Sequence, residues 1–271
     1  MSKGIVPKLI EKFRIKILKQ PDNSKERKRA ERNKSLLGYL SKIEGTKQYE
    51  FFDHQKVLNH LMIMDELEES KVKEHQVVLL RTRLCRTVEF IIKHTQNQIF
   101  EKDTTVLEFG DASGIMLEYF NKTGTSLNID ETSHKMILGK GFDSIHSDIM
   151  DLKPELKFDY IFAFQVLEHV SDPIGVLNKL RQAVNKMIFI SIPYKGSKTR
   201  IKSLGYYPSN SEYTQDEKVK NAYHHHIFEF SPNDFRSIIS HAQLEEFAYE
   251  ECYNFYPDDP RFQFWALKPL A

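Results

Sequence analysis

The chain has 271 residues, of which 40% are hydrophobic and 28% are charged, and its formal net charge is +1 at pH 7. These totals describe a soluble globular protein and exclude a chain that is strongly basic as a whole. No apolar run approaches the ~20 residues that span a bilayer, and the start of the chain lacks a signal-peptide cleavage pattern. Cys85 and Cys252 lie far apart, without the spacing of a disulfide framework or a zinc site. We therefore expect a cytoplasmic protein.

The first 35 residues differ in charge from the rest. They hold twelve Lys or Arg against four Asp or Glu, a net +8, which leaves about −7 for the remainder. Residues 4–20 place apolar side chains at helical spacing between lysines. Two interpretations stay open: a basic amphipathic helix on an anionic membrane surface, or a solvated helix whose apolar stripe docks on the main domain. We interpret 1–35 as a tail and linker.

Residues 36–100 are predicted to form a helical cap region. Two sets of apolar residues recur three and four apart, one from Val57 to Met64 and one from Val77 to Ile91. This spacing predicts two amphipathic helices. No Gly or Pro lies between residues 46 and 109, so we expect the second helix to lead directly into the first strand.

After Thr104 short apolar strands alternate with helices. Strands are predicted at 105–109, 126–129, 143–146, 159–164 and 187–192, and helices at 113–121, near 132–138 and at 173–184. This alternation predicts an α/β fold with a doubly wound, Rossmann-like, mostly parallel sheet covered on both faces.

The end of the chain follows a different pattern. The polar stretch 194–222 is too long for an ordinary connection and is predicted to be a lid or substrate loop. Ser231 and Pro232 have the residue types of a helix start, with Ser231 as N-cap. The runs 244–256 and 261–267 flank a turn at Asp258-Asp259-Pro260, which predicts an antiparallel C-terminal hairpin. We interpret 101–271 as one domain.

Chemistry-bearing residues follow the first three of these strands. Glu108-x-Gly110-x-x-x-Gly114 follows the first, Asp130 the second and Asp148 the third. Each acid alone could be a helix cap or a turn residue. In a parallel sheet, however, all of them emerge at the edge where ligands bind, and glycine lets the backbone approach a ligand closely. Together they predict a site for a nucleoside-containing cofactor.

The order and spacing of these residues resemble the class I methyltransferases that use S-adenosylmethionine, over about residues 100–270. The most specific run is FQVLEHVSDP at 164–173, which is similar to the "VLEHV-x-DP" signature of the small-molecule branch (types 11, 12 and 23). MIFISIP at 187–193 matches the fifth strand of that family. Phe228, Ser231 and Pro232 resemble its later "H-x-x-x-F-S/T-P" element.

The resemblance implies roles for particular residues. Glu108, Gly110, Asp111 and Gly114 belong to the turn that wraps the methionine part of S-adenosylmethionine, and Asp130 binds the ribose. It also implies that Asp148 contacts the adenine amino group and that Ile149 packs against the adenine ring. Gln165 would lie beside the methyl donor. The family usually has glycine where this chain has Ala112, and a Cβ there is unfavourable if the backbone needs a positive φ.

The chemistry also suggests catalytic candidates. An oxygen acceptor must lose a proton, and a histidine near neutral pKa suits that task. The candidates are His169 and the cluster 224–226, of which His226 is the most plausible. Three adjacent histidines point alternately up and down, so they cannot readily face one ion, and we expect no metal.

The sequence therefore predicts a methyltransferase for a hydroxyl or amine of a small molecule or glycan precursor. Two alternatives stay open: an RNA methyltransferase recruited through the basic tail, and a non-catalytic partner protein that keeps the fold. Nucleic acid is disfavoured, because residues 165–168 differ from the Asn/Asp-Pro-Pro-Tyr/Phe motif of many base-methylating enzymes. The sequence does not give the acceptor or the oligomeric state.

Overall fold

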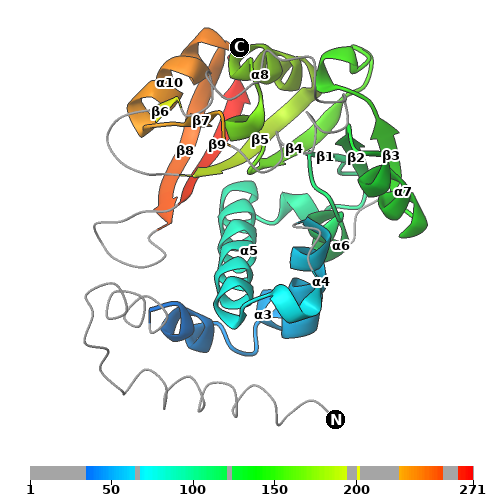
Figure 1. Ribbon diagram of the computed structural model, residues 1–271. Coiled ribbons are helices and arrows are strands. Elements are labelled where there is room, and N and C mark those ends of the chain that lie inside the picture. Colours follow the sequence, from blue (N-terminus) through cyan, green and yellow to red (C-terminus); the bar gives the residue numbers. More distant parts are fainter. Residues whose placement is uncertain are drawn as a thin grey trace, which may run out of the picture.

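The computed structural model describes residues 35–64, 68–120, 124–193, 200–201, 226–252 and 262–270 (Figure 1). The amphipathic segment 4–20, most of the expected lid, His224 and His225, and the expected turn at 258–260 lie outside these ranges.

Seven strands form one sheet in the order β3-β2-β1-β4-β5-β9-β8. Their bounds are β1 Val106–Phe109, β2 Thr125–Asn128, β3 Asp143–His146, β4 Phe158–Phe164, β5 Val184–Pro193, β8 Leu244–Cys252 and β9 Phe262–Pro269. The first five are parallel, whereas β9 is antiparallel to both β5 and β8. The predicted doubly wound sheet with an antiparallel C-terminal hairpin is confirmed. The strand order reverses between β1 and β4, and open α/β sheets bind ligands at the carboxyl ends of such strands.

Helices cover both faces of the sheet (Figure 1). Period-two alternation decides which face each strand residue meets: Tyr160 and Phe162 belong to one core, Ile161 and Ala163 to the other. The first core includes α3 (Lys47–Phe51), α4 (His54–Met64), α5 (Glu74–Thr95) and α6 (Ile115–Phe120), and the second includes α8 (Pro173–Ala183) and α10 (Pro232–His241). Helix α7 (Glu131–Gly139) packs beside β2 and β3. None of the helices in the described ranges has the length and apolar character to cross a bilayer.

The region predicted to contain two helices contains a helix at 35–42 as well as α3, α4 and α5, with a 3-10 turn η1 (Glu69–Lys71) before α5. Helix α4 starts where the carboxylate of Asp53 accepts a hydrogen bond from the Lys56 N–H at 2.8 Å. Helix α5 ends at Gln96 and Asn97, whose φ angles are 49° and 67°. A further 3-10 turn, η2 (Gln98–Phe100), separates α5 from β1. Polar caps make these breaks, so a search for Gly and Pro could not find them.

The helical region shares a hydrophobic core with the sheet. Phe90 of α5 packs edge-on against Phe189 of β5, with ring centroids 6.0 Å apart, and stacks on Phe264 of β9 at 5.6 Å. Buried residues from Leu36 to Ile99 belong to the same cluster as these two strands. The long helix α5 therefore supports one face of the sheet, as Figure 1 shows.

Candidate functional site

The glycine turn between β1 and α6 has the backbone that its sequence predicts. Gly110 and Gly114 have φ angles of +78° and +68°, a region that favours glycine. Ala112 is absent from the described non-glycine residues with positive φ. Its Cβ therefore causes no backbone strain, and the turn tolerates alanine there.

Two acids of the chain occupy the amino end of α6. The Oδ2 atom of Asp111 accepts hydrogen bonds from the N–H groups of Ser113 at 3.1 Å, Gly114, and Ile115 at 3.2 Å. Glu108 is 2% exposed, and hydrogen bonds from backbone N–H groups of α6 partly stabilise its charged form. Burial and the charge of Asp111 nevertheless raise its pKa well above the ordinary value. The N–H groups of this helix end are therefore already occupied, by the Asp111 carboxylate and by the buried Glu108 carboxyl group.

Side chains from three other elements fasten the turn. Nδ1 of His60, on α4, lies 2.6 Å from Oγ of Ser113. Lys140, after α7, donates to the Ser113 carbonyl at 2.6 Å, and Asn128, at the end of β2, donates to the Asp111 carbonyl at 2.9 Å. Burial lowers the pKa of His60 to about 4, so this histidine is neutral at pH 7. These three contacts stabilise the conformation of the turn in the absence of a ligand.

Asp130 lies directly beyond the end of β2 and caps helix α7. Its Oδ2 accepts from the Ser133 N–H at 2.6 Å, and its own N–H donates to Oδ1 of Asn128 at 2.9 Å. A carboxylate has two oxygens, so capping leaves the other one able to accept a hydrogen bond from a ligand. Asp130 thus has a structural contact and also lies at the carboxyl edge of the sheet, the edge at which open α/β sheets bind ligands.

Asp148 follows β3 at the same edge. It is exposed, and its Oδ1 accepts from the Met150 N–H at 2.9 Å. Ile149, which was expected to pack on adenine, is 3% exposed and lies in the core. The exposed apolar side chains beside the two acids are Ile129, at 48%, and Met150, at 45%. These two side chains are therefore available to a flat apolar ring at this edge.

Gln165 leaves β4 with a φ of 57°, in the left-handed region. Its N–H donates to the Ser191 carbonyl at 2.8 Å, and its Nε2 donates to Oγ of the same residue at 3.2 Å. Such conformations cost of order 1–3 kcal/mol and cluster at functional sites. The next residue, Val166, packs against Gly110, so the ends of β1 and β4 meet at the switch point.

The two histidines proposed as catalytic lie together. The rings of His169 and His226 are T-shaped, with centroids 5.0 Å apart. The Ile227 N–H donates to the Glu168 carbonyl at 2.7 Å, which ties the segment of His226 to the 3-10 turn η4 (Leu167–His169). Glu168 is 0% exposed, and burial raises its pKa to about 8. The buried carboxyl group of Glu168 therefore lies beside the two histidines.

Comparison with known proteins agrees with this geometry. The model of the methyltransferase domain family matches residues 79–246. The chain belongs to this family. This confirms the resemblance seen in the sequence. A search of curated proteins finds no matching relative.

Solved methyltransferases share the fold. Magnesium protoporphyrin IX methyltransferase from Synechocystis PCC 6803, with bound SAH, superposes with a TM-score of 0.52 at 13% identity, covering 79% of this chain and 95% of that one. A glycopeptide N-methyltransferase complexed with S-adenosyl-L-methionine gives a TM-score of 0.50 at 9% identity, covering 68% and 93%. At these identities the likeness concerns the fold alone.

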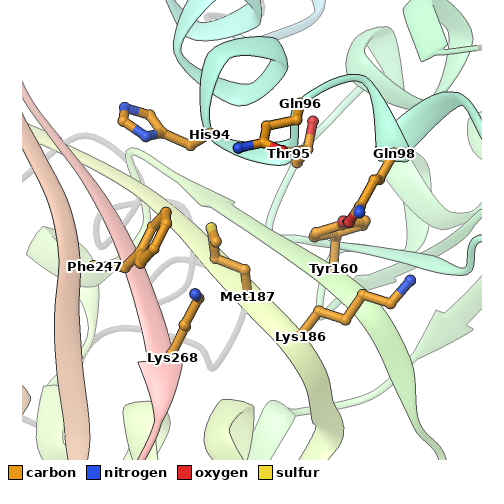
Figure 2. Close-up of a pocket in the computed structure, with 9 residues that line it drawn as sticks. All are labelled: His94, Thr95, Gln96, Gln98, Tyr160, Lys186, Met187, Phe247 and Lys268. Carbon is orange, nitrogen blue, oxygen red and sulfur yellow. The ribbon is translucent and has the colours of Figure 1, made fainter.

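A separate cavity of about 380 Å³ lies away from this edge of the methyltransferase sheet (Figure 2). Its walls come from the last turn of α5, the amino-terminal halves of β4 and β5, and strands β8 and β9, and include His94, Tyr160, Lys186, Phe247 and Lys268. Because parallel strands of such folds bind their ligands at the carboxyl ends, we assign this cavity no part in the site.

Sequence reasoning did not find His60, Lys140, Asn128, Ile129, Met150 or Glu168 as site residues. Most of these residues contact parts of the chain that are distant in sequence, and such contacts cannot be predicted from motifs or from hydrophobic periodicity. Only Asn128 and Ile129 carried a usable signal, because they flank the end of a predicted strand next to Asp130.

Proposed function

We propose that the protein transfers a methyl group from S-adenosylmethionine to a hydroxyl or amine of a small molecule or glycan precursor. The observation that carries this proposal is the amino end of α6. A bare helix amino end attracts phosphate, but here Asp111 and Glu108 occupy it. An acidic, filled helix end suits a cofactor that carries positive charge and no phosphate, which distinguishes S-adenosylmethionine from a dinucleotide.

The residues at the strand ends fit such a cofactor. The turn 110–114 brings the backbone close to the amino-acid part, because glycine stands at both positive-φ positions. Asp130 would accept hydrogen bonds from the ribose hydroxyls, and Asp148 from the adenine amino group. Ile129 and Met150 would contact the faces of the adenine ring. Gln165, which is fixed by Ser191, would border the methyl donor.

The chain's own contribution to the reaction is alignment and proton transfer. S-adenosylmethionine, when bound, supplies a methyl group on a positively charged sulfur. The fixed turn and the strained Gln165 would orient the acceptor in line with that group and exclude water. His169 ends η4 and His226 lies against it, with ring centroids 5.0 Å apart, and one of them would accept the proton of an acceptor hydroxyl.

Calorimetric titration with S-adenosylmethionine and S-adenosylhomocysteine tests the cofactor. Asp130→Asn is the sharpest variant, because asparagine still caps a helix but does not provide a negatively charged acceptor for the ribose. We expect micromolar binding by the wild type and at least tenfold weaker binding by Asp130→Asn. Asp53→Asn, which alters the equivalent contact at the start of α4, is the matched control and should bind normally. A folded wild type that binds neither ligand would support the non-catalytic alternative.

The place of the reaction is a further part of the proposal. We place it in the cytoplasm, with residues 4–20 as a contact to an anionic membrane surface. Liposome flotation of the full chain and of a chain lacking residues 1–34 tests this contact. RNA retention at several salt concentrations tests the nucleic-acid alternative, because phosphate contacts weaken strongly with salt.

A further inference from the structure

A buried carboxyl group and two imidazoles converge beside the proposed methyl-transfer site. One ligand atom each from Glu168, His169 and His226 lies within 4.8 Å of the others. Nε2 of His169 is 4.0 Å from Oε1 of Glu168, and Nδ1 of His226 is 3.8 Å from Oε1 of Glu229. The His226 segment reaches Glu168 through the hydrogen bond from Ile227. The sequence predicted no metal because the three adjacent histidines 224–226 cannot readily face one ion. This cluster contains only His226 of those three, together with Glu168 and His169 of η4.

Glu168 is the residue that calls for an explanation. Its side chain is 0% exposed, and neither carboxyl oxygen has a described partner at hydrogen-bond geometry; its own backbone N–H and the charge of Arg83 offset only part of the burial. Buried polar groups are almost always paired, because an unpaired one has lost its hydration without compensation. A cation held between Glu168 and the histidines would compensate it.

We propose that Glu168, His169 and His226 bind one divalent first-row transition-metal ion, such as Zn²⁺, Mn²⁺ or Co²⁺. Two imidazole nitrogens and one carboxylate suit these ions better than Mg²⁺ or Ca²⁺, which prefer oxygen ligands alone. Ligand atoms about 2.1 Å from one ion are at most about 4.2 Å apart. The ligand atoms lie within 4.8 Å of one another, so metal binding would require the two imidazoles to turn toward the ion. Glu229, whose side chain is 1% exposed, borders His226 and orients its ring or completes the ligand set.

The ion would have open coordination positions on the outer side. Glu168 forms the floor, whereas the side chains of His169 and His226 are 22% and 30% exposed. A site with three protein ligands leaves room for a substrate atom, as in catalytic rather than structural metal sites. The cluster follows Gln165 and Val166, and Val166 contacts the cofactor turn.

This placement indicates the acceptor class, and that part of the inference rests on the proposed function. An acceptor bound to the ion would be an oxygen compound with two adjacent oxygen atoms, for example a vicinal diol or a hydroxyketone. Coordination lowers the pKa of a bound hydroxyl, whose proton then passes to water. With both imidazoles bound to the metal, the ion replaces the histidine base of the proposed function. Bound in this way, the acceptor would be methylated on oxygen.

The test uses the full chain after treatment with a chelator. Co²⁺ is titrated by its visible absorption and Zn²⁺ by calorimetry, for the wild type, Glu168→Gln, His226→Gln and His134→Gln. His134 is the matched control: it stacks on His146 with centroids 5.4 Å apart, at a pair without a buried acid. We expect one ion per chain, binding at least tenfold weaker in the first two variants, and no change in His134→Gln.

S-adenosylhomocysteine is titrated into the same samples. Its binding shows that each variant is folded, and it separates the two proposals. If the wild type binds S-adenosylhomocysteine but neither metal ion, the metal site is overturned and the proposed function stands. If it binds an ion but not S-adenosylhomocysteine, the reverse holds. Equal metal affinity in Glu168→Gln and the wild type also overturns the site.

Discussion

Gly110 and Val166 are in such close contact that a Cβ added to the glycine would lie 2.6 Å from Cγ2 of the valine. This contact joins the turn after β1 to the loop after β4. β1 and β4 are neighbouring parallel strands between which the strand order of the sheet reverses, so the contact lies at the switch point. A bulkier side chain at Gly110 would therefore displace Val166.

Alanine at Gly110 should be more damaging than alanine at Gly114. Both glycines have positive φ, which costs an alanine about 1 kcal/mol. At Gly114 the new Cβ would be 3.7 Å from its nearest neighbour, an ordinary contact, whereas at Gly110 it would collide with a stiff β-branched side chain. Urea unfolding should show a larger loss for Gly110→Ala, and Val166→Ala in the same chain should return the excess. Equal losses at the two glycines would contradict the contact.

His60 should make stability depend on pH in the acid range. Its pKa falls from 6.5 to about 4 on folding, mainly through burial, with Arg83 and Lys140 acting in the same direction and Asp111 against it. Below pH 6.5 the unfolded chain therefore binds the proton first, and stability is lost as the pH falls toward 4, by up to about 3 kcal/mol. Above pH 6.5 both states are neutral and the contribution is constant.

The measurement is the free energy of unfolding of the wild type and of His60→Gln between pH 4 and 8. Glutamine can still hydrogen-bond to Ser113 but does not titrate. The wild type should lose stability relative to the variant only below about pH 6.5. Parallel curves over the whole range would show that His60 titrates normally.

Glu108 should act in the opposite direction. Burial and the nearby Asp111 raise its pKa on folding, so its contribution is present at low pH and is lost as the pH rises through the folded value. Glu108→Gln imitates the protonated group. The variant should gain stability relative to the wild type as the pH increases from 5 to 8, in thermal or urea unfolding. A relative gain as the pH decreases would refute the assignment.

Gln165 allows backbone strain to be separated from side-chain contacts. Gln165→Gly and Gln165→Ala both remove the side-chain hydrogen bond to Oγ of Ser191 and keep the backbone one, but only glycine relieves the positive φ. The alanine variant should therefore be less stable, by about 1 kcal/mol. If the side chain borders the cofactor as proposed, both variants should bind S-adenosylmethionine more weakly than the wild type. Identical stabilities would mean that the left-handed conformation is not retained.

The strands and the helix starts were readable because their causes are local. A short apolar run predicted β4, and Ser231 caps α10 as expected, with its Oγ accepting from the Asp234 N–H at 3.2 Å. The positive φ of Gly110 and Gly114 follows from residue type. The break between α3 and α4 was missed because Asp53, an ordinary surface acid in sequence, makes it.

The contacts of the candidate site could not be read in the same way. His60 stands among apolar helix residues, directly before the run 61–64, and only the fold shows that it reaches Ser113. Glu168 was visible as part of a signature, but its complete burial depends on the segment of His226 and Ile227 that covers it. Spacing along the chain locates the strand ends, whereas packing decides which side chains face each other there.

The position of β9 bears on how the protein is made. This strand comes last among those described, yet it lies inside the sheet, between β5 and β8. During synthesis, the edges of β5 and β8 that pair with β9 therefore stay unpaired until residues 262–269 have left the ribosome. Exposed strand edges are templates for aggregation. Folding of the sheet can be completed only late in translation. Nascent chains that stall before Phe262 should consequently depend on chaperones, whereas the parallel half, β3-β2-β1-β4-β5, can assemble earlier.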